Sequence, residues 1–289
     1  MAEIRVLQPG DEIALEAFLL PHLESSMFLI GNCRAAGLRD RGKPLQGTYA
    51  GAFEGGHLIG VVAHYWNGNL ILQAPEALLQ VLIEAALRVS GRVLRGLIGP
   101  AEQVGRAKQI LGLAENKVQL DETENLYHLD LSDLVVPEDL RLGRLQARRC
   151  EPKDLDLLTR WRVGFSLESL GAEDTSQLWR QCRASVERSL ADGQTWMLIH
   201  EGRPVSTSSF NTAFEEAVQV GVVWTPPELR SRGYGRSVVA ASLLDARAEG
   251  ASQSILFTGV RNIPAQRAYA ALGFRHTGNY RLLLLRGSS

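Results

Sequence analysis

The sequence carries an internal repeat, which restricts the possible folds more than any other feature. A short apolar strand, a turn containing Pro and Asp, and an amphipathic helix occur over residues 4–20 and again over residues 145–165. Asp11 and Asp154 occupy the same place in the two copies, 143 residues apart. We expect both carboxylates to accept hydrogen bonds from first-turn N–H groups of the following helix. The repeat predicts two copies of one fold.

Two later features of the repeat show where the copies differ. Each copy has a hairpin with a Glu-Gly turn, at Gly55 and Gly202, and a last helix that ends in Leu-Gly, at Gly112 and Gly273. The separation grows from 147 residues at the hairpin to 161 at the last helix, so the second copy holds 14 additional residues between them. We therefore predict a loop that the first copy lacks. Two unrelated α/β domains are the alternative interpretation.

Chain length and a break in the hydrophobic periodicity predict where the domains divide. A chain of 289 residues, 45% of them hydrophobic, is long enough for two globular cores. Asp133, Pro137 and neighbouring charged residues interrupt the periodicity up to residue 142. We predict one domain over residues 1–136 and a second over residues 142–289.

Composition excludes several classes of protein. The formal net charge of −1 gives no global attraction to nucleic acid or to an anionic membrane. The three cysteines lack CxxC spacing and the histidines lack metal-ligand spacing, so we expect no metal site and a reducing compartment. The apolar runs are shorter than a membrane span needs, and the first residues lack a basic stretch followed by an apolar one, so we expect neither a membrane span nor a secretory signal. We expect a cytoplasmic protein of undetermined oligomeric state.

The additional residues of the second copy include a candidate anion site. The β-prone run 217–224 ends at Pro226 and Pro227, and the sequence Arg-Ser-Arg-Gly-Tyr-Gly over 230–235 then leads into a helical run, 236–249. A glycine-containing loop before a helix N-terminus exposes backbone N–H groups at the positive end of the helix dipole. Arg230, Arg232 and Arg236 add positive charge there. The spacing fits neither the dinucleotide GxGxxG motif nor the GxxxxGK[ST] phosphate loop.

Two motifs in this half resemble those of the GCN5-related N-acetyltransferase (GNAT) family. Its pyrophosphate pattern, Q/R-x-x-G-x-G/A, is met by Arg230, Gly233 and Gly235. Its downstream pattern N-x-x-A-x-x-x-Y-x-x-x-G-F is met by five residues: Asn262, Ala265, Tyr269, Gly273 and Phe274. The resemblance covers about residues 217–280. It implies tandem acyl-CoA N-acyltransferase-like folds of the α/β (α+β) class, each with a mixed, mostly antiparallel sheet flanked by helices.

The resemblance also implies a co-substrate, acetyl-CoA, and a role for each matching residue. The strand before the loop is expected to splay from its neighbour and to hold the pantetheine arm through Val222, Val223 and Trp224. The pyrophosphate is expected to bind the loop and the helix start, which comprise Arg230, Ser231, Arg232, Gly233, Tyr234, Gly235 and Arg236. Asn262 is expected near the cysteamine end. Tyr269 is expected to protonate the leaving thiolate, since a phenol stays protonated at neutral pH.

The general base is not identified by the sequence. Some members of the family carry a carboxylate on this strand, at a position that falls near Gln219 here, and a glutamine amide cannot take a proton. Glu215 and Glu216 at the start of the strand remain candidates, directly or through water. Glu168 and His200 are further candidates for the base, but only because their side chains can accept a proton.

The first half lacks the phosphate loop, the asparagine and the tyrosine of these motifs. Its corresponding strand, 70–74, leads through Pro75 straight into a helix, and Ala101 and Lys108 stand opposite Asn262 and Tyr269. We predict a degenerate acetyltransferase-like domain that binds no CoA and shapes the acceptor side. Residues 25–32 are expected either to line that side or to form an apolar transition from helix to loop.

These observations predict an acetyl-CoA-dependent N-acetyltransferase with one active site. The acceptor is expected to be the amine of a small or amino-acid-like molecule, which attacks the thioester directly in a ternary complex. One alternative is a non-catalytic CoA-binding or sensing protein, which the loss of the carboxylate at Gln219 favours. Another is an acyltransferase that uses a different acyl chain.

Overall fold

The computed structural model describes residues 2–286, which divide into two compact units. Unit 1 contains the chain up to Leu126 together with the residues from Thr277 onward, and unit 2 spans Tyr127–His276. These bounds differ from the predicted domains 1–136 and 142–289, because the last strand of the chain pairs within unit 1. The predicted roles of the two halves stay predictions.

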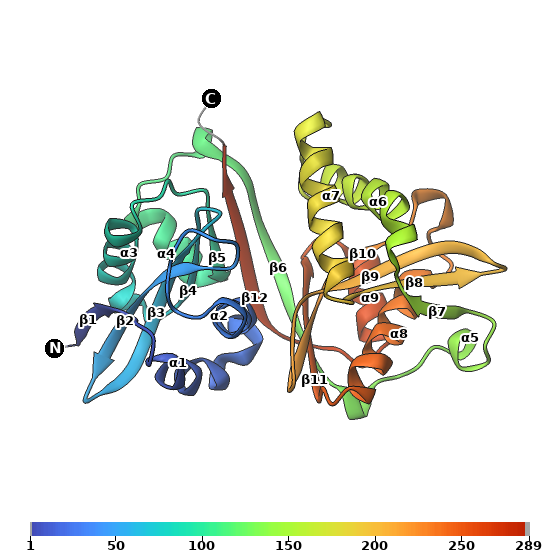
Figure 1. Cartoon of the computed structure of the whole chain (residues 1–289), viewed down its shortest axis with the longest axis horizontal. Coiled ribbons are helices and arrows are strands. Elements are labelled where there is room, and N and C mark those ends of the chain that lie inside the picture. Colours follow the sequence, from blue (N-terminus) through green and yellow to red (C-terminus); the bar gives the residue numbers. More distant parts are fainter. Residues whose placement is uncertain (1, 287–289) are drawn as a thin grey trace. The chain divides into compact units, whose positions relative to one another are not determined.

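Unit 1 is a mixed sheet with helices on both faces (Figure 1). Its elements in chain order are β1 (Glu3–Val6), α1 (Glu12–Leu19), α2 (Leu23–Ala36), β2 (Gly47–Glu54), β3 (His57–Tyr65), β4 (Asn69–Gln73), α3 (Glu76–Ser90), β5 (Gly96–Pro100), α4 (Ala101–Ile110), β6 (Val118–Asp130) and β12 (Arg275–Leu285). The strands lie in the order β1-β2-β3-β4-β5-β12, with β6 next to β12. Strands β4 and β5 are parallel, while β2 pairs antiparallel with β1 and β3, β3 with β4, and β5 with β12. Helices α3 and α4 pack on one face, and α1 and α2 cover the other.

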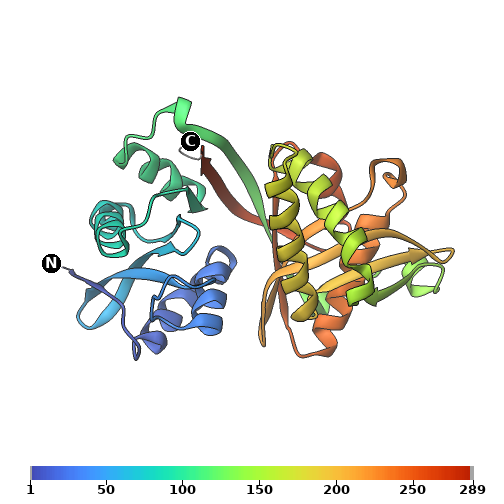
Figure 2. The same ribbon diagram turned by 45° about the horizontal axis from the view of Figure 1, so that its top comes forward.

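Unit 2 has the same arrangement of strands and helices (Figure 2). Its elements are α5 (Glu138–Arg141), β7 (Gln146–Arg149), α6 (Leu155–Ser169), α7 (Ser176–Ala191), β8 (Thr195–His200), β9 (Arg203–Phe214), β10 (Ala217–Trp224), α8 (Tyr234–Ala248), β11 (Gln253–Gly259) and α9 (Ile263–Ala270). The order β11-β10-β9-β8-β7 matches β5-β4-β3-β2-β1 of unit 1, and the last residues of β6 adjoin β11. Helix α8 covers one face of the sheet, while α6 and α7 lie together on the other.

The internal repeat is therefore real in three dimensions, and the predicted mixed, mostly antiparallel fold is confirmed. One detail of the prediction is wrong: neither Asp11 nor Asp154 caps its helix with a side-chain hydrogen bond. Each carboxylate instead binds an arginine of the preceding strand, Arg5 or Arg148, because a guanidinium offers two stronger, charge-assisted bonds.

Residues 25–32 lie inside one continuous helix, α2, so the expected transition from helix to loop does not occur there. Met27, Leu29 and Ile30 are fully buried against the sheet of unit 1. The longer segment Glu12–Ala36 has the length and hydropathy of a possible membrane-spanning helix. A 3₁₀ turn, η1 (Leu20–His22), divides it into α1 and α2, and buried core helices of ordinary globular domains have the same composition.

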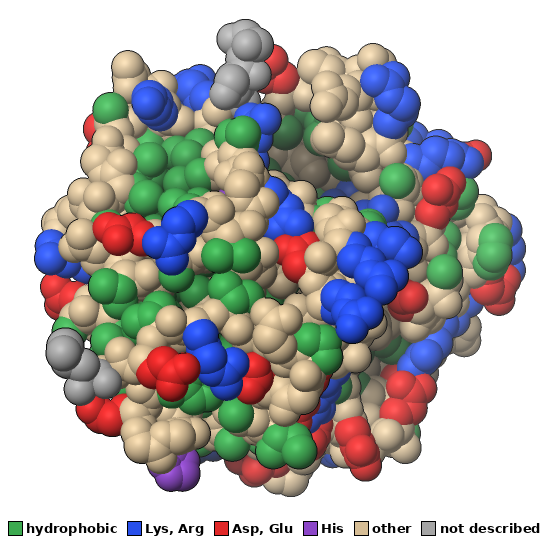
Figure 3. Space-filling model, turned by 60° about the vertical axis from the view of Figure 1, so that its left-hand side comes forward, with side chains coloured by type: hydrophobic (Ala, Val, Ile, Leu, Met, Phe, Trp, Pro, Cys, Tyr) green, Lys and Arg blue, Asp and Glu red, His purple; other side chains and the backbone are tan. Residues whose placement is uncertain are grey.

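The surface of unit 1 mixes both signs of charge. Figure 3 turns this unit toward the viewer and shows Lys, Arg, Asp and Glu side chains lying among hydrophobic ones. Several charges of unit 1 form ion pairs, such as Arg34 with Glu16 at 2.8 Å. This face therefore presents no broad field of one sign.

Candidate active site

The sheet of unit 2 opens between two of its strands, as the family resemblance implies. Strands β10 and β11 pair in parallel at Ala217, Val218 and Gln219, and no described residue of β10 beyond Gln219 pairs with β11. The register with β9 also shifts twice between Gln219 and Val223. A bulge leaves backbone groups without ladder partners. The segment Val220–Trp224 therefore offers backbone N–H and C=O groups to a ligand in this opening.

The loop after β10 ends in a helix N-terminus without a side-chain cap. Gly233 is the N-cap of α8 with a φ of 76°, and no side chain binds the first-turn N–H groups. Ser231 also has a positive φ, 62°, a conformation that favours glycine and is uncommon for serine. A Cβ atom at Gly235 would lie 3.5 Å from Thr225 Oγ1, which is ordinary contact. The protein itself thus has room for a larger residue at 235, so packing alone does not require glycine there.

Arg230 is held beside the opening by three contacts. Its guanidinium donates to both carboxylate oxygens of Glu168 on α6, each at 2.9 Å, and its Nε donates to the carbonyl of Thr225 at 3.0 Å. It also lies over the ring of Trp224, 4.9 Å from the ring centroid. The conformation of the loop is therefore set by α6 as well as by β10.

Trp224 lies against α6 through a close approach that requires glycine. A Cβ atom at Gly164 would lie 2.9 Å from the ring of Trp224. The backbone carbonyl of Trp224 accepts a hydrogen bond from Ser206 Oγ at 3.0 Å. Val222 and Val223 are partly accessible beside it, so all three predicted pantetheine contacts lie on the part of β10 that has no partner on β11.

The remaining loop residues differ in how firmly they are held. Tyr234 is buried, and its hydroxyl lies 2.7 Å from His200 Nδ1. Arg232 is exposed. The Nε of Arg236 is buried without a hydrogen-bond partner. A buried N–H group without a partner is costly, and a phosphate oxygen would relieve that cost.

Asn262 and Tyr269 belong to α9. The side chain of Asn262 caps this helix by accepting from the N–H of Ala265 at 3.2 Å. Tyr269 is buried, and its ring lies 6.5 Å from that of Tyr127 and 5.9 Å from that of Phe274. It shares one hydrophobic cluster with Val220, Val223 and Tyr234, which connects it to β10 and α8.

Gln219 marks the point at which the two strands separate. The residue is 1% exposed, and its Oε1 is buried without a hydrogen-bond partner. Val218 and Val220 on either side pack in the cluster beneath α8, so the pleat directs Gln219 to the opposite face, where α6 packs against β10. An acceptor oxygen is thus available on the face opposite α8.

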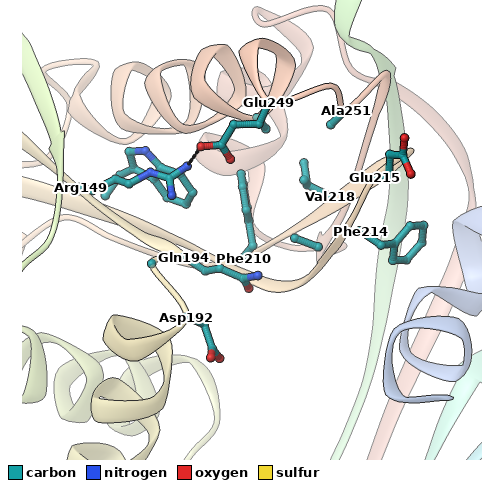
Figure 4. A pocket seen from close by; sticks show the side chains of 13 residues that line it. Arg149, Asp192, Gln194, Phe210, Phe214, Glu215, Val218, Glu249 and Ala251 are labelled. Carbon is teal, nitrogen blue, oxygen red and sulfur yellow. Dashed lines mark hydrogen bonds and ion pairs between the residues drawn. The ribbon is translucent and has the colours of Figure 1, made fainter. Parts of the chain in front are cut away.

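The other candidate bases are engaged or distant. Glu168 is bound to Arg230, and His200 to Tyr234. Glu215 lines a pocket of about 240 Å³ at the start of β10 (Figure 4). Trp196, Phe210 and the ion pair Arg149–Glu249 also line this pocket. None of the predicted cofactor-binding residues lines it, so it is separate from the opening that follows Gln219. Among residues 2–286, no cluster of His, Cys, Asp and Glu is placed to hold a metal ion.

The corresponding place in unit 1 is built differently. Two residues separate β4 from α3, whereas nine separate β10 from α8. Pro75 is the N-cap of α3, and Glu76 stands in its first turn, where a negative charge opposes phosphate binding. Lys108, opposite Tyr269 in sequence, is bound to Glu115 and Asp121.

Sequence reasoning missed Arg162 on α6. It falls on the buried stripe of this helix with Leu158, Thr159, Val163 and Ser166. A cationic residue within the apolar face of an amphipathic helix was the available signal.

Comparisons with known proteins agree with this architecture. Residues 160–274 match the acetyltransferase (GNAT) family. A mycothiol acetyltransferase from Acidothermus cellulolyticus is 26% identical over 218 residues, which are 68% of this chain and 64% of that protein. The chain thus covers slightly less than two thirds of that relative.

Solved structures extend the similarity of fold to nearly the whole chain. A GCN5-related N-acetyltransferase from Kribbella flavida has a TM-score of 0.59 at 19% identity and covers 91% of this chain and 94% of its own. A tandem GNAT protein from the clavulanic acid biosynthesis pathway has a TM-score of 0.57 at 14% identity, with both chains covered completely. At these identities the likeness shows the fold alone.

The fold and the opening in unit 2 define a tandem protein with the acyltransferase fold. Within it, residues 160–274 form a domain that matches the acetyltransferase (GNAT) family.

Proposed function

We propose that this protein is an acetyl-CoA-dependent N-acetyltransferase with a single active site in unit 2. The observation that carries the proposal is the uncapped N-terminus of α8 next to the opening between β10 and β11. The first-turn N–H groups of α8, Arg236 and the loop would bind the pyrophosphate, and the free backbone of Val222–Trp224 would bind the pantetheine arm. The acetyl group of the co-substrate supplies the electrophilic carbon.

The residues around the opening support direct transfer to an amine. The amine nitrogen forms a bond to the acetyl carbon while the carbon–sulfur bond breaks. A backbone N–H of β10 would stabilise negative charge on the carbonyl oxygen. Tyr269 would donate its phenolic proton to the leaving sulfur. Gln219 Oε1 would hold the attacking amine or a water, and the proton lost by the amine would pass to that water.

The acceptor is proposed to be a small molecule that bears a primary amine. Release of free thiol from acetyl-CoA in the presence of a panel of small amines and amino acids tests this function. Amine-dependent thiol release, together with acetylated product detected by mass spectrometry, is the expected result. Thiol release without acetylated amine would mean hydrolysis and would contradict the proposal.

A second candidate function is CoA binding without catalysis. It is favoured by one observation, the glutamine at position 219 in place of a proton acceptor. Acetyl-CoA bound with micromolar affinity, but with no turnover across the amine panel, would support this alternative over the enzyme. Turnover with another acyl-CoA but not with acetyl-CoA would show a different acyl chain.

A further inference from the structure

The buried face of α6 carries a guanidinium among apolar and small side chains. Arg162 lies one turn from Leu158 and Ser166, both of which are buried. Arg162 thus falls on the same side of α6 as these residues, and α6 packs against α7 (Figure 2). Arg160 on the same helix is exposed, so the difference is one of helical face.

The partners of Arg162 are weak ones for a positive charge. The thiol of Cys182 on α7 lies close enough to interact with its guanidinium, whose carbon is 5.5 Å from the ring centroid of Phe165. A thiol is a weak acceptor, while a guanidinium has five N–H donors to satisfy. Burial lowers the pKa of Arg162, and Cys182 offsets that effect only in part. Among residues 2–286 no carboxylate pairs with Arg162.

Other arginines of unit 2 show what Arg162 lacks. Four of them form ion pairs at 2.9 Å or less: Arg148 with Asp154, Arg149 with Glu249, Arg183 with Asp156, and Arg230 with Glu168. Arg162 is half-buried and, among residues 2–286, has no such partner. A guanidinium that is partly desolvated and has no anion beside it is unfavourable, and a ligand that brings the anion would remove this cost.

The position of α6 connects Arg162 to the active site. Gly164 lies against Trp224, and Glu168 holds Arg230 at the start of the loop. Arg162 precedes Glu168 by six residues, about 9 Å along the helix axis, on the side away from the loop. It is thus displaced from the phosphate end of the site. Gln219 is directed to the same face of the sheet on which α6 packs.

We propose that Arg162 binds a carboxylate of the acceptor, so that the substrate is an amine that also carries a carboxylate group. This inference rests on the proposed function and names the acceptor class for the same site. The guanidinium donates two parallel hydrogen bonds to the carboxylate, and the amine end of the same molecule reaches the acetyl carbon.

The experiment compares acceptors that differ only in charge. Amino acids and their carboxamides are assayed as pairs with the wild-type protein, Arg162→Gln, Arg162→Lys and the control Arg160→Gln. The wild type should prefer the carboxylates. Arg162→Gln should raise their KM by about 10- to 100-fold and leave that of acetyl-CoA unchanged. Arg162→Lys should be intermediate because it keeps the charge but not the paired geometry. Arg160→Gln should match the wild type.

Several outcomes would overturn the inference. Equal kcat/KM values for carboxylates and carboxamides would do so, and so would a rise in the KM for acetyl-CoA rather than for the acceptor. If Arg162→Gln does not fold, the comparison rests on Arg162→Lys and the substrate pairs. If the wild type acetylates no amine at all, the proposed function fails separately. Calorimetry with the amino acids then decides, since absence of Arg162-dependent binding would overturn the inference as well.

Discussion

Arg148 donates two hydrogen bonds to Asp154, from Nη1 to Oδ2 at 2.7 Å and from Nη2 to Oδ1 at 2.8 Å. Arg5 and Asp11 form the same pair in unit 1, at 2.6 and 2.8 Å. The backbone N–H of the residue three positions before each aspartate, Gln8 or Glu151, completes the arrangement at 2.8 Å. All three positions are separated by the same 143 residues. The repeat thus extends to individual hydrogen bonds that tie β1 to the start of α1 and β7 to the start of α6.

Asp154→Asn should lower the free energy of unfolding at pH 7 by about 1.5–3 kcal/mol, because it removes a charge-assisted pair that is largely buried. The hydrogen bond from Arg148 lowers the pKa of Asp154 in the folded state. The stabilisation is therefore present above the ordinary pKa of aspartate and is lost as the pH falls through the lowered value. Urea unfolding at pH 7 and pH 3 measures this. Asp156→Asn, which alters an exposed pair on the same helix, should change stability by less than about 0.5 kcal/mol.

Tyr269→Phe should reduce kcat by about 100-fold or more while the KM for acetyl-CoA stays near the wild-type value. The substitution removes the proposed proton donor but keeps the ring that packs against Tyr127 and Phe274. Steady-state thiol release measures both constants. Tyr127→Phe, a change of the same kind in the same cluster, serves as control and should retain activity. An unchanged kcat in Tyr269→Phe would remove this residue from the role of acid.

Gly235→Ala should weaken acetyl-CoA binding by about tenfold or more without lowering the melting temperature. The new methyl group meets only ordinary contacts within the protein, and alanine favours a helix over glycine. It would instead occupy the space through which phosphate oxygens reach the backbone. Calorimetric titration and thermal melting separate the two effects. Gly105→Ala, in α4 of unit 1, should leave binding intact; equal affinity in Gly235→Ala would argue against the loop as the phosphate site.

Saturating acetyl-CoA should bind with a stoichiometry of one per chain. Unit 1 has two residues where unit 2 has the loop, and Glu76 stands at the start of α3. Isothermal titration calorimetry measures the number of sites directly. Two equivalents, or one equivalent that persists when Gly233 and Gly235 are both replaced by Val, would place a site elsewhere.

Glu124→Gln should stabilise the protein at high pH and have little effect at low pH. Burial raises the pKa of Glu124 from 4.5 to about 7, and its Oε2 has no hydrogen-bond partner. The folded state therefore holds the proton more tightly than the unfolded state, and stability falls as the pH rises from about 4.5 to about 7. The amide of the Glu124→Gln variant does not ionise, so at pH 8 the free energy of unfolding of the variant should exceed that of the wild type by up to roughly 3 kcal/mol. Denaturant unfolding at pH 4.5 and pH 8 measures it.

Glu102→Gln, an exposed change in α4, is the control for that measurement and should show no such pH dependence. A difference between Glu124→Gln and the wild type that is the same at both pH values would refute the explanation by proton binding.

Much of the fold was readable from short stretches of sequence. The β-prone run 217–224 is a strand with the same bounds, and the helix expected from Arg236 begins two residues earlier, at Tyr234. The splay after Gln219 was expected from the family resemblance and is present. The cap assignments at Asp11 and Asp154 were wrong because a competing arginine of the preceding strand has the stronger bond to offer.

Other features depend on partners that are distant in sequence. The last strand, β12, pairs with β5, and Arg230 meets Glu168, which is 62 residues away. No local pattern indicates such pairings, because any exposed strand edge or carboxylate of suitable geometry would satisfy the same groups.

The sequence by itself determined the duplicated pattern, the glycine loop in the second copy and the order of strands and helices, since these follow from local periodicity and backbone preferences. Only the tertiary structure decided that β12 pairs with β5 in unit 1 and that Gln219 is buried with no hydrogen-bond partner for its Oε1. It alone also showed that, among residues 2–286, Arg162 has no carboxylate partner. The physical reason is that burial and the pairing of charges depend on all neighbours of a residue, and most of those neighbours come from other parts of the chain.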